Sequence, residues 1–178
     1  MNKKKLFNPG LTEREKMQFE SLVKANMKRA YFVALGFLGS EDDAAEISQE
    51  AFIRAYRNFK KFDKTKNFFT WYYKILKNLC LNFIRDTKTK KNGFLEVEEL
   101  NTTVDDPAEY IEKKELHEKL EKALIELDFE DREIIVLKEF QQMSYKEIAE
   151  MLKIPVGTVM SKLFYARKKL AKKLKGII

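Results

Sequence analysis

Apolar residues recur at helical spacing through the first half of the chain, and the pattern predicts three amphipathic helices. A capping box formed by Thr12 and Glu15 opens the first helix. Gly39 is a stop signal for that helix, and Ser40 is a suitable cap for the next one, over 41–59. A short lysine-rich loop over 60–67 leads to a third long helix over about 68–87.

The second half of the chain repeats this helical character after an interruption. No sustained period runs through 88–110, which contains turn-forming dipeptides and a run of acids, so we interpret it as a linker. Helices are expected again over 111–127 and 130–140, the latter capped by Asp128. The predicted fold class is all-α: two small helical domains, over 1–87 and 111–178, joined by an acidic flexible linker over 88–110.

The C-terminal segment predicts a helix-turn-helix. A capping box of Ser144 and Glu147 opens a short helix, and Lys153 with the next residue forms the turn. Pro155 suits the first position of the second helix, where no backbone amide is needed. From residue 141 to 178 there are nine lysines and arginines against two glutamates. A helix-turn-helix with a basic second helix is typical of a nucleic-acid reader.

Composition excludes several classes of function. The 178 residues include one cysteine, Cys80, which falls in an apolar stretch and is interpreted as a buried small hydrophobe, and one histidine, His117. This leaves no metal-ligand cluster and no cysteine–histidine nucleophile. There is also no glycine-rich phosphate loop, so neither an enzyme nor a cofactor is expected. No apolar run approaches the ~20 residues of a membrane span, no signal peptide is recognisable, and a cytoplasmic location is expected.

Charge alternates in blocks along the chain. The formal net charge is +7, which favours an anionic partner. Residues 41–52 hold five acids and no base, whereas 53–91 hold twelve bases and two acids. Residues 92–121 reverse again, with ten acids and three bases. A protein that only coats DNA has little need for such alternation, so we expect several partners, or one partner with surfaces of both signs.

Three of these segments resemble the extracytoplasmic-function (ECF) class of bacterial sigma factors, the two-domain specificity subunits of RNA polymerase. That family's polymerase-binding helix is similar to DDAAEISQEAFIRAYRNFKKFD, and its −10 promoter reader is similar to FFTWYYKILKNLCLNFIRD. Its −35 reader is similar to MSYKEIAEMLKIPVGTVMSKLFYARKKL. The resemblance covers nearly all of 19–174. It implies as partners the RNA polymerase core (beta-prime clamp and beta subunit), promoter DNA and an anti-sigma factor, and a role in promoter melting.

The helix over 41–59 contains the candidate polymerase-binding residues. Ile53 lies between carboxylates on the face opposite the apolar stripe, which is typical of a protein interface with an apolar centre and a charged rim. The resemblance implies that the basic coiled coil of the beta-prime clamp is the partner. The predicted set is Asp43, Glu46, Gln49, Glu50 and Ile53.

The next loop and helix contain the candidate −10 residues. Cations along one face of the helix would bind phosphates, and Asn78 suits a base edge. The resemblance implies that the loop, with Phe62 inside it, captures a base flipped out of the melted strand. The predicted set is Lys61, Phe62, Lys64, Lys66, Asn67, Lys74, Lys77, Asn78, Leu81 and Arg85.

The helix-turn-helix contains the candidate −35 residues, which are Ser144, Thr158, Met160, Ser161, Lys162, Phe164, Tyr165, Arg167 and Lys168. Two positions depart from the family. Lys153 stands where relatives often have glycine, and a left-handed backbone there costs a non-glycine residue ~1 kcal/mol. Met160 stands where relatives are frequently basic, which affects the expected base preference.

Two other functions fit part of the sequence. A stand-alone helix-turn-helix regulator would bind a palindrome as a dimer, but the first domain contains no ligand motif and no heptad seam. A helical RNA-binding or ribosome-associated structural protein would explain the basic charge. It would not explain the acidic helix or the acidic linker.

Overall fold

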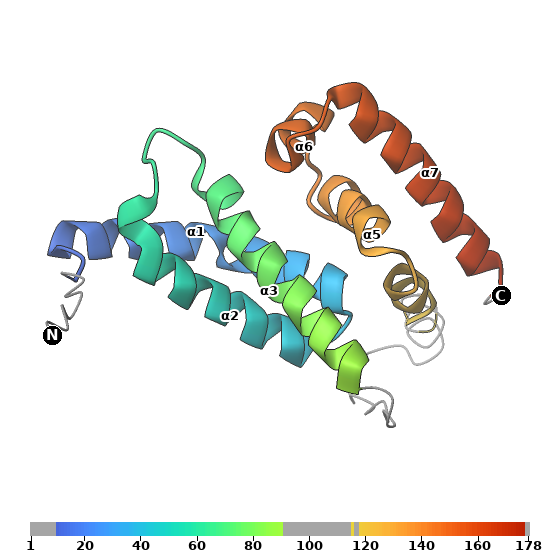
Figure 1. Ribbon diagram of the computed structural model, residues 1–178, viewed down its shortest axis with the longest axis horizontal. Helices are drawn as coiled ribbons and strands as arrows, with labels where there is room; N and C mark the ends of the chain where they lie inside the picture. The colour runs from blue at the N-terminus through green and yellow to red at the C-terminus, as the bar shows by residue number, and fades with distance from the viewer. Residues whose placement is uncertain (1–9, 91–114, 116–117, 177–178) are drawn as a thin grey trace, which may run out of the picture.

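The computed structural model describes residues 10–90, 115 and 118–176, and every regular element within those ranges is a helix (Figure 1). This confirms the predicted all-α class. The predicted linker beyond residue 90 and His117 lie outside the described residues. The domain boundaries at 87, 88, 110 and 111 therefore stay predictions.

The first unit is built from three long helices. Helix α1, Glu13–Leu38, starts with the predicted capping box, in which the Thr12 amide donates to the Glu15 carboxylate at 2.9 Å. It ends at Gly39, whose φ of 70° is left-handed and favours glycine. Helix α2, Glu41–Asn58, is capped by the Ser40 hydroxyl, and the turn η1, Phe59–Lys61, follows it. Helix α3, Phe68–Lys90, extends three residues past the predicted end.

Aromatic rings fill the end of this unit where the loop 60–67 returns to α3. Phe19 of α1 contacts Phe59 with ring centroids 5.1 Å apart, and Phe59 in turn contacts Phe68. Deeper in the unit the Tyr72 hydroxyl donates to the Ser48 carbonyl at 3.0 Å, which ties α3 to α2. These contacts fix which faces of α2 and α3 remain exposed.

The second unit differs in detail from the sequence prediction. Residues 118–125 are helical, followed by α5, Phe129–Ile135, and by η2, a π-helical turn at Val136–Phe140. The predicted single helix over 130–140 is therefore divided. Asp128 lies at the start of α5, but its side chain makes no capping hydrogen bond and is 3.8 Å from Lys169 instead.

The helix-turn-helix comprises α6, Tyr145–Leu152, and α7, Val156–Lys175. The capping box of Ser144 and Glu147 is confirmed, with the Ser144 amide 2.8 Å from the carboxylate. Pro155 precedes α7 as its cap residue and does not occupy the first helical position, which corrects that prediction. Lys153 adopts φ 57° and ψ 46°, so the turn keeps its left-handed backbone without glycine.

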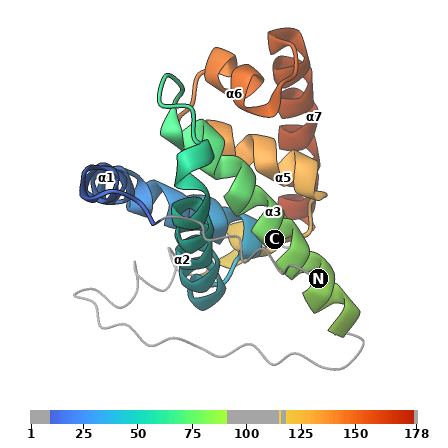
Figure 2. The same ribbon diagram turned by 60° about the vertical axis from the view of Figure 1, so that its left-hand side comes forward.

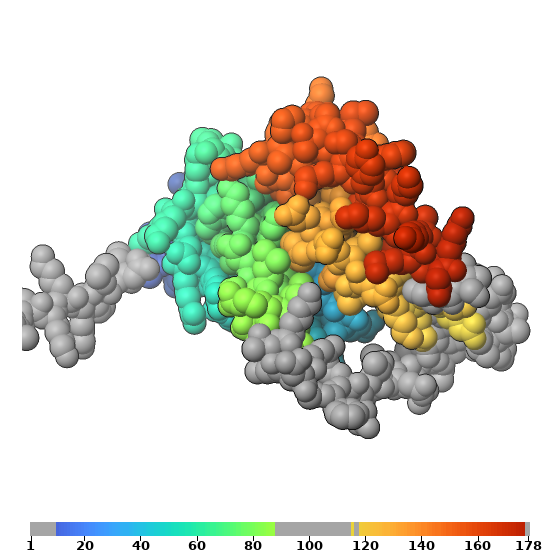
Figure 3. All heavy atoms as spheres, turned by 45° about the vertical axis from the view of Figure 1, so that its right-hand side comes forward, coloured from blue at the N-terminus to red at the C-terminus, as the bar shows by residue number. Residues whose placement is uncertain are grey.

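The two units lie against each other. In the ribbon views α5 lies beside α3 (Figure 1, Figure 2). The turn η2 packs on the C-terminal part of α1, where Gly36 lies against Val136. The space-filling view shows the atoms of α3 and of the second unit meeting along a seam (Figure 3). Helices α2 and α7 lie on the outside of this arrangement.

Candidate nucleic-acid and protein interfaces

The outward face of α2 displays acids around an exposed isoleucine. Ile53 is 46% exposed, and Glu46 and Gln49 are also exposed. Asp43 and Glu50 are partly buried at the margin of the same face. Because the opposite side of α2 is buried against α1 and α3, this face is held rigidly.

The acids of this face are not equivalent. The Glu50 carboxylate accepts a hydrogen bond from Arg54 at 2.7 Å within α2. Glu46 has no ion pair with any residue in the described part of the chain. Glu46 is thus the acid of this face most available to a basic partner.

The loop 60–67 presents polar groups, with Lys61, Lys64, Lys66 and Asn67 exposed. Asp63 organises it by accepting hydrogen bonds from the Thr65 hydroxyl at 2.7 Å and the Thr65 amide at 3.0 Å, and these bonds lower the pKa of Asp63. A lysine-bearing loop of fixed shape is suited to a phosphate backbone.

Phe62 lies in this loop, but its ring packs against neighbouring aromatic rings. It is only 7% exposed, its ring stacks on Phe59 with centroids 5.8 Å apart, and it contacts Trp71 at 5.1 Å. Most of the Phe62 ring is therefore buried, and the capture of a flipped base by this loop stays a prediction. Sequence alone does not show that the loop folds back on α3.

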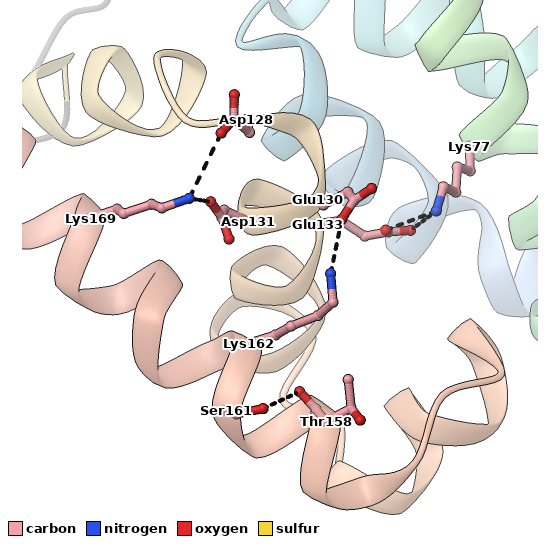
Figure 4. A network of polar contacts seen from close by, with 9 residues as sticks. All are labelled: Lys77, Asp128, Glu130, Asp131, Glu133, Thr158, Ser161, Lys162 and Lys169. Atoms are coloured by element: carbon pink, nitrogen blue, oxygen red, sulfur yellow. Dashed lines mark hydrogen bonds and ion pairs between the residues drawn. The ribbon is translucent and has the colours of Figure 1, made fainter.

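The predicted −10 face of α3 is largely accessible. Lys74, Asn78 and Arg85 are exposed, and Leu81 is partly buried between them. Lys77 differs, because its ammonium pairs with Glu133 of α5, at 2.6 Å from one carboxylate oxygen and 2.8 Å from the other (Figure 4). The structure therefore brings one predicted DNA contact into the seam between the two units.

The outward face of α7 combines large exposed side chains with a cation. Met160 is 54% exposed, Phe164 63% and Tyr165 60%, and Lys168 is exposed one turn further on. Ser161 is exposed, and its hydroxyl donates to backbone carbonyls of α7, including that of Thr158 at 3.1 Å (Figure 4). Thr158 itself is partly buried, and the Ser144 hydroxyl is occupied by its cap bond to Glu147 at 2.7 Å.

The cations on the flanks of α7 pair with acids of the same unit. Lys162 donates to Glu130 at 2.9 Å, and this contact raises the pKa of Lys162 (Figure 4). Arg167 pairs with Glu139, which likewise raises the pKa of the guanidinium. Binding DNA through Lys162 or Arg167 would require an exchange of partners, whereas Lys168 makes no ion pair with the residues that the structure describes.

Other chemistry is absent from the described ranges. No group of three or more His, Cys, Asp or Glu residues there is arranged to hold a metal ion, and no described helix is long and apolar enough to cross a membrane. Cys80 is buried in α3 as predicted, and burial raises the pKa of its thiol to about 12. The thiol therefore stays protonated at neutral pH.

Sequence reasoning missed the residues that join the two units. Tyr73, Arg132 and Glu133 are buried in the seam, and Gly36 of α1 lies directly against Val136. One signal was present in the sequence. Arg132 and Glu133 directly precede the apolar run 134–137, where charged residues on a buried stretch usually have specific partners.

The fold and its exposed faces define a class: an all-helical protein of two units, with a helix-turn-helix of the kind found in DNA-binding proteins at the end and an exposed acidic face on α2. Residues 22–90 match the family Sigma-70 region 2, and residues 117–170 match Sigma-70, region 4. The chain is 34% identical over 170 residues to the ECF RNA polymerase sigma factor SigW of Bacillus subtilis strain 168, covering 89% of this chain and 90% of that protein. It therefore belongs to the ECF sigma factors of RNA polymerase.

Other similar proteins support this family assignment. The ECF RNA polymerase sigma-E factor of Escherichia coli K12 is 30% identical over 145 residues, 76% of each chain. The fold is shared with the sigma factor RpoE of Bartonella quintana, solved with the anti-sigma factor NepR, at a TM-score of 0.68 and 21% identity over 89% of this chain and 97% of that one. CnrH, solved in complex with the cytosolic domain of CnrY, also shares the fold, at a TM-score of 0.66 and 24% sequence identity over 90% of each chain. The family is one of non-catalytic initiation factors, and a stand-alone dimeric regulator is not favoured.

Proposed function

We propose that this sigma factor binds the RNA polymerase core through the outward face of α2, reads the −10 element with the loop 60–67 and α3, and reads the −35 element with α7. Promoter melting is assisted at the −10 element. The observation that supports this assignment best is the separation of charge: an acidic face around Ile53 on α2 and basic faces on α3 and α7.

Each face fits its partner chemically. An exposed isoleucine with Glu46 beside it matches a basic protein surface, since interfaces combine an apolar centre with a charged rim. On α3, Lys74 would bind phosphate while Asn78 reaches a base edge. On α7, the apolar side chain of Met160 would contact a thymine methyl group, and Lys168 would bind a phosphate. None of these steps makes or breaks a covalent bond, so the protein acts as a binding factor.

The same faces are available to a regulator. Two solved proteins of this fold are complexes, one with an anti-sigma factor and one with the cytosolic domain of CnrY. We extend this to the present chain and infer an anti-sigma partner, and we place its action in the cytoplasm with the polymerase.

A charge reversal on α2 tests the proposal. Glu46→Lys places a cation against a basic partner and should weaken binding of purified core polymerase at least about tenfold, since like charges across an interface cost several kcal/mol. Affinity for the core is measured without DNA, and circular dichroism confirms that the helix content is retained.

Glu150→Lys is the matched control, because it makes the same charge change on an exposed position of α6 in the other unit. It should bind core polymerase like the unaltered protein. Equal affinities for the Glu46 and Glu150 variants would remove α2 as the polymerase-binding element.

A further inference from the structure

Over residues 156–175, which the structure describes throughout, α7 has no free arginine, asparagine or glutamine side chain. Guanine and adenine are read in the major groove mainly by pairs of hydrogen bonds from arginine, lysine, asparagine or glutamine. Asparagine and glutamine do not occur in this segment. Its one arginine, Arg167, donates to Glu139 through Nε at 2.9 Å and through a second nitrogen. The guanidinium is therefore already occupied within the second unit.

The other polar side chains near the start of α7 are also poorly placed to read bases. Lys162 donates to Glu130 at 2.9 Å, and the Ser161 hydroxyl donates to backbone carbonyls of α7 at 3.1 Å (Figure 4). Lys168 lies more than two turns beyond Met160, whereas the N-terminal residues of a recognition helix are the ones that contact base edges. Lys168 is therefore suited to a phosphate.

The first turn of α7 permits a close approach of DNA. An ideal Cβ on Gly157 would meet no neighbouring side chain and no other helix within 4 Å, so packing within the protein does not require glycine there. Glycine is also less favourable than alanine inside a helix, because it loses more backbone entropy on folding. Glycine has a function at this position if the backbone comes close to base edges, where a side chain would obstruct the groove.

Large apolar side chains follow Gly157 on the same side of the helix. Met160 is 54% exposed and Phe164 is 63% exposed, and their spacing of four residues makes them neighbours on the helix surface. Phe164 contacts the ring of Tyr165 in a T-shaped arrangement with centroids 5.4 Å apart, which restricts the orientation of both rings. The thymine methyl group is the apolar group that the major groove offers to such side chains.

We propose that this sigma factor reads its −35 element through the methyl groups of thymines, and that Met160 and Phe164 are the residues that contact them. This inference rests on the proposed −35 role of α7 and names the base chemistry that the helix selects. Four residues extend about 6 Å along a helix, close to two base-pair steps of B-DNA, so the two side chains would reach thymines about two steps apart. A G·C pair has no methyl group in the major groove and would not be selected at either position.

Removing the methyl groups alone tests the proposal. The probe is a genomic DNA fragment that the unaltered protein transcribes with core polymerase, and a footprint of the complex locates its −35 element. Deoxyuridine then replaces thymidine within that element, which removes each methyl group and keeps every hydrogen-bonding group of the base. Burial of one methyl group corresponds to about fourfold in affinity, so the loss of two contacts should weaken binding of the unaltered holoenzyme about tenfold.

A second fragment controls for the chemistry of the replacement. It contains the same number of deoxyuridines between the −35 and −10 elements and keeps thymidine in the −35 element. Its affinity should change by less than about twofold, because phosphate contacts do not depend on the methyl group.

A double variant assigns the methyl contacts to α7. Met160→Ala combined with Phe164→Ala should distinguish the thymidine fragment from the −35 deoxyuridine fragment by less than about twofold, because the side chains that contact the methyl groups are gone. Met27→Ala is the matched control, since it removes a similarly exposed methionine, 56% against 54%, from α1 of the other unit. It should keep the full distinction between the two fragments. Circular dichroism confirms that both variants retain their helix content.

The outcomes separate this inference from the proposed function. Failure of the unaltered protein to direct transcription with core polymerase would overturn the proposed function. If it does direct transcription, equal affinity for the thymidine and −35 deoxyuridine fragments would overturn methyl recognition. So would a −35 element without thymine on either strand. A distinction that persists in the double variant would overturn the assignment to Met160 and Phe164.

Discussion

Lys153, in the turn of the helix-turn-helix, has an unfavourable backbone conformation. Its φ of 57° lies in the left-handed region, which a side chain with a Cβ enters at a cost of roughly 1–2 kcal/mol. The turn is held in spite of that cost because the amide of Ile154 donates to the Ala149 carbonyl at 3.1 Å. Pro155 then fixes the chain direction into α7.

Replacing Lys153 by glycine should therefore stabilise the protein. Relief of the left-handed strain exceeds the extra chain entropy of glycine, so Lys153→Gly should raise the free energy of unfolding by about 0.5–1 kcal/mol. Urea denaturation followed by far-ultraviolet circular dichroism measures it. Ala171→Gly, at an exposed helical position of α7, should lower stability by about 1 kcal/mol, and a shift of both variants in the same direction would contradict the strain argument.

Structural features that involve only residues close together in the chain could be predicted from the sequence. The capping boxes at Thr12 and Ser144 were predicted and are present, because each involves residues three apart. The pairing of Lys77 with Glu133 was not predicted, since the two residues are 56 positions apart and no periodicity reports on such a contact. The same holds for Phe62, whose burial depends on how a loop folds back.

Among the elements, Arg132 is a shared anchor for two helix ends. Its guanidinium donates to the carbonyls of Leu124, Ile125 and Leu127, at the end of the helix over 118–125, and to Phe37 near the end of α1. Carbonyls at helix ends often lack a partner within their own helix, so one buried side chain supplies donors to helix ends of both units. The Leu124 carbonyl also accepts the Leu127 amide at 3.1 Å. Burial lowers the pKa of Arg132, and these four acceptors compensate for its loss of water.

Arg132→Lys should destabilise the protein strongly despite keeping the charge. An ammonium group lacks the planar fork that reaches several carbonyls at once, and unsatisfied buried carbonyls cost roughly 1–3 kcal/mol each. We expect a loss of about 2–4 kcal/mol in urea denaturation. Arg54→Lys, at an exposed ion pair on α2, should change stability by less than about 1 kcal/mol, and a similar loss in both variants would show that the anchor is unimportant.

At the scale of the whole molecule, the sequence predicted the order and type of the elements but not their docking. The helical periods and caps defined each helix of the first unit to within three residues. The π-helical turn η2 was not foreseen, because its backbone departs from the 3.6-residue period that the pattern measures. The docking of the units depends on contacts as distant as Phe37 and Arg132, which are 95 positions apart.

The paired cations of α7 affect how the whole molecule responds to its ionic surroundings. Lys162, Arg167, Lys169 and Lys173 are each matched by an acid of the same unit. When such a cation moves to a phosphate, DNA releases a counterion, but the abandoned carboxylate recruits one from solution. The net release is then smaller than the number of basic residues indicates.

Glu130→Gln should restore the net counterion release that the ion pair with Lys162 otherwise offsets. The slope of the logarithm of the DNA association constant against the logarithm of the salt concentration should steepen by up to about 0.9, the value for one phosphate contact. Glu150→Gln, which removes an exposed acid from α6, should leave the slope unchanged, and identical slopes in the two variants would contradict the exchange. The internal acids thus act as resident counterions, and they let this protein hold promoter DNA with less sensitivity to ionic strength than a bare basic helix would show.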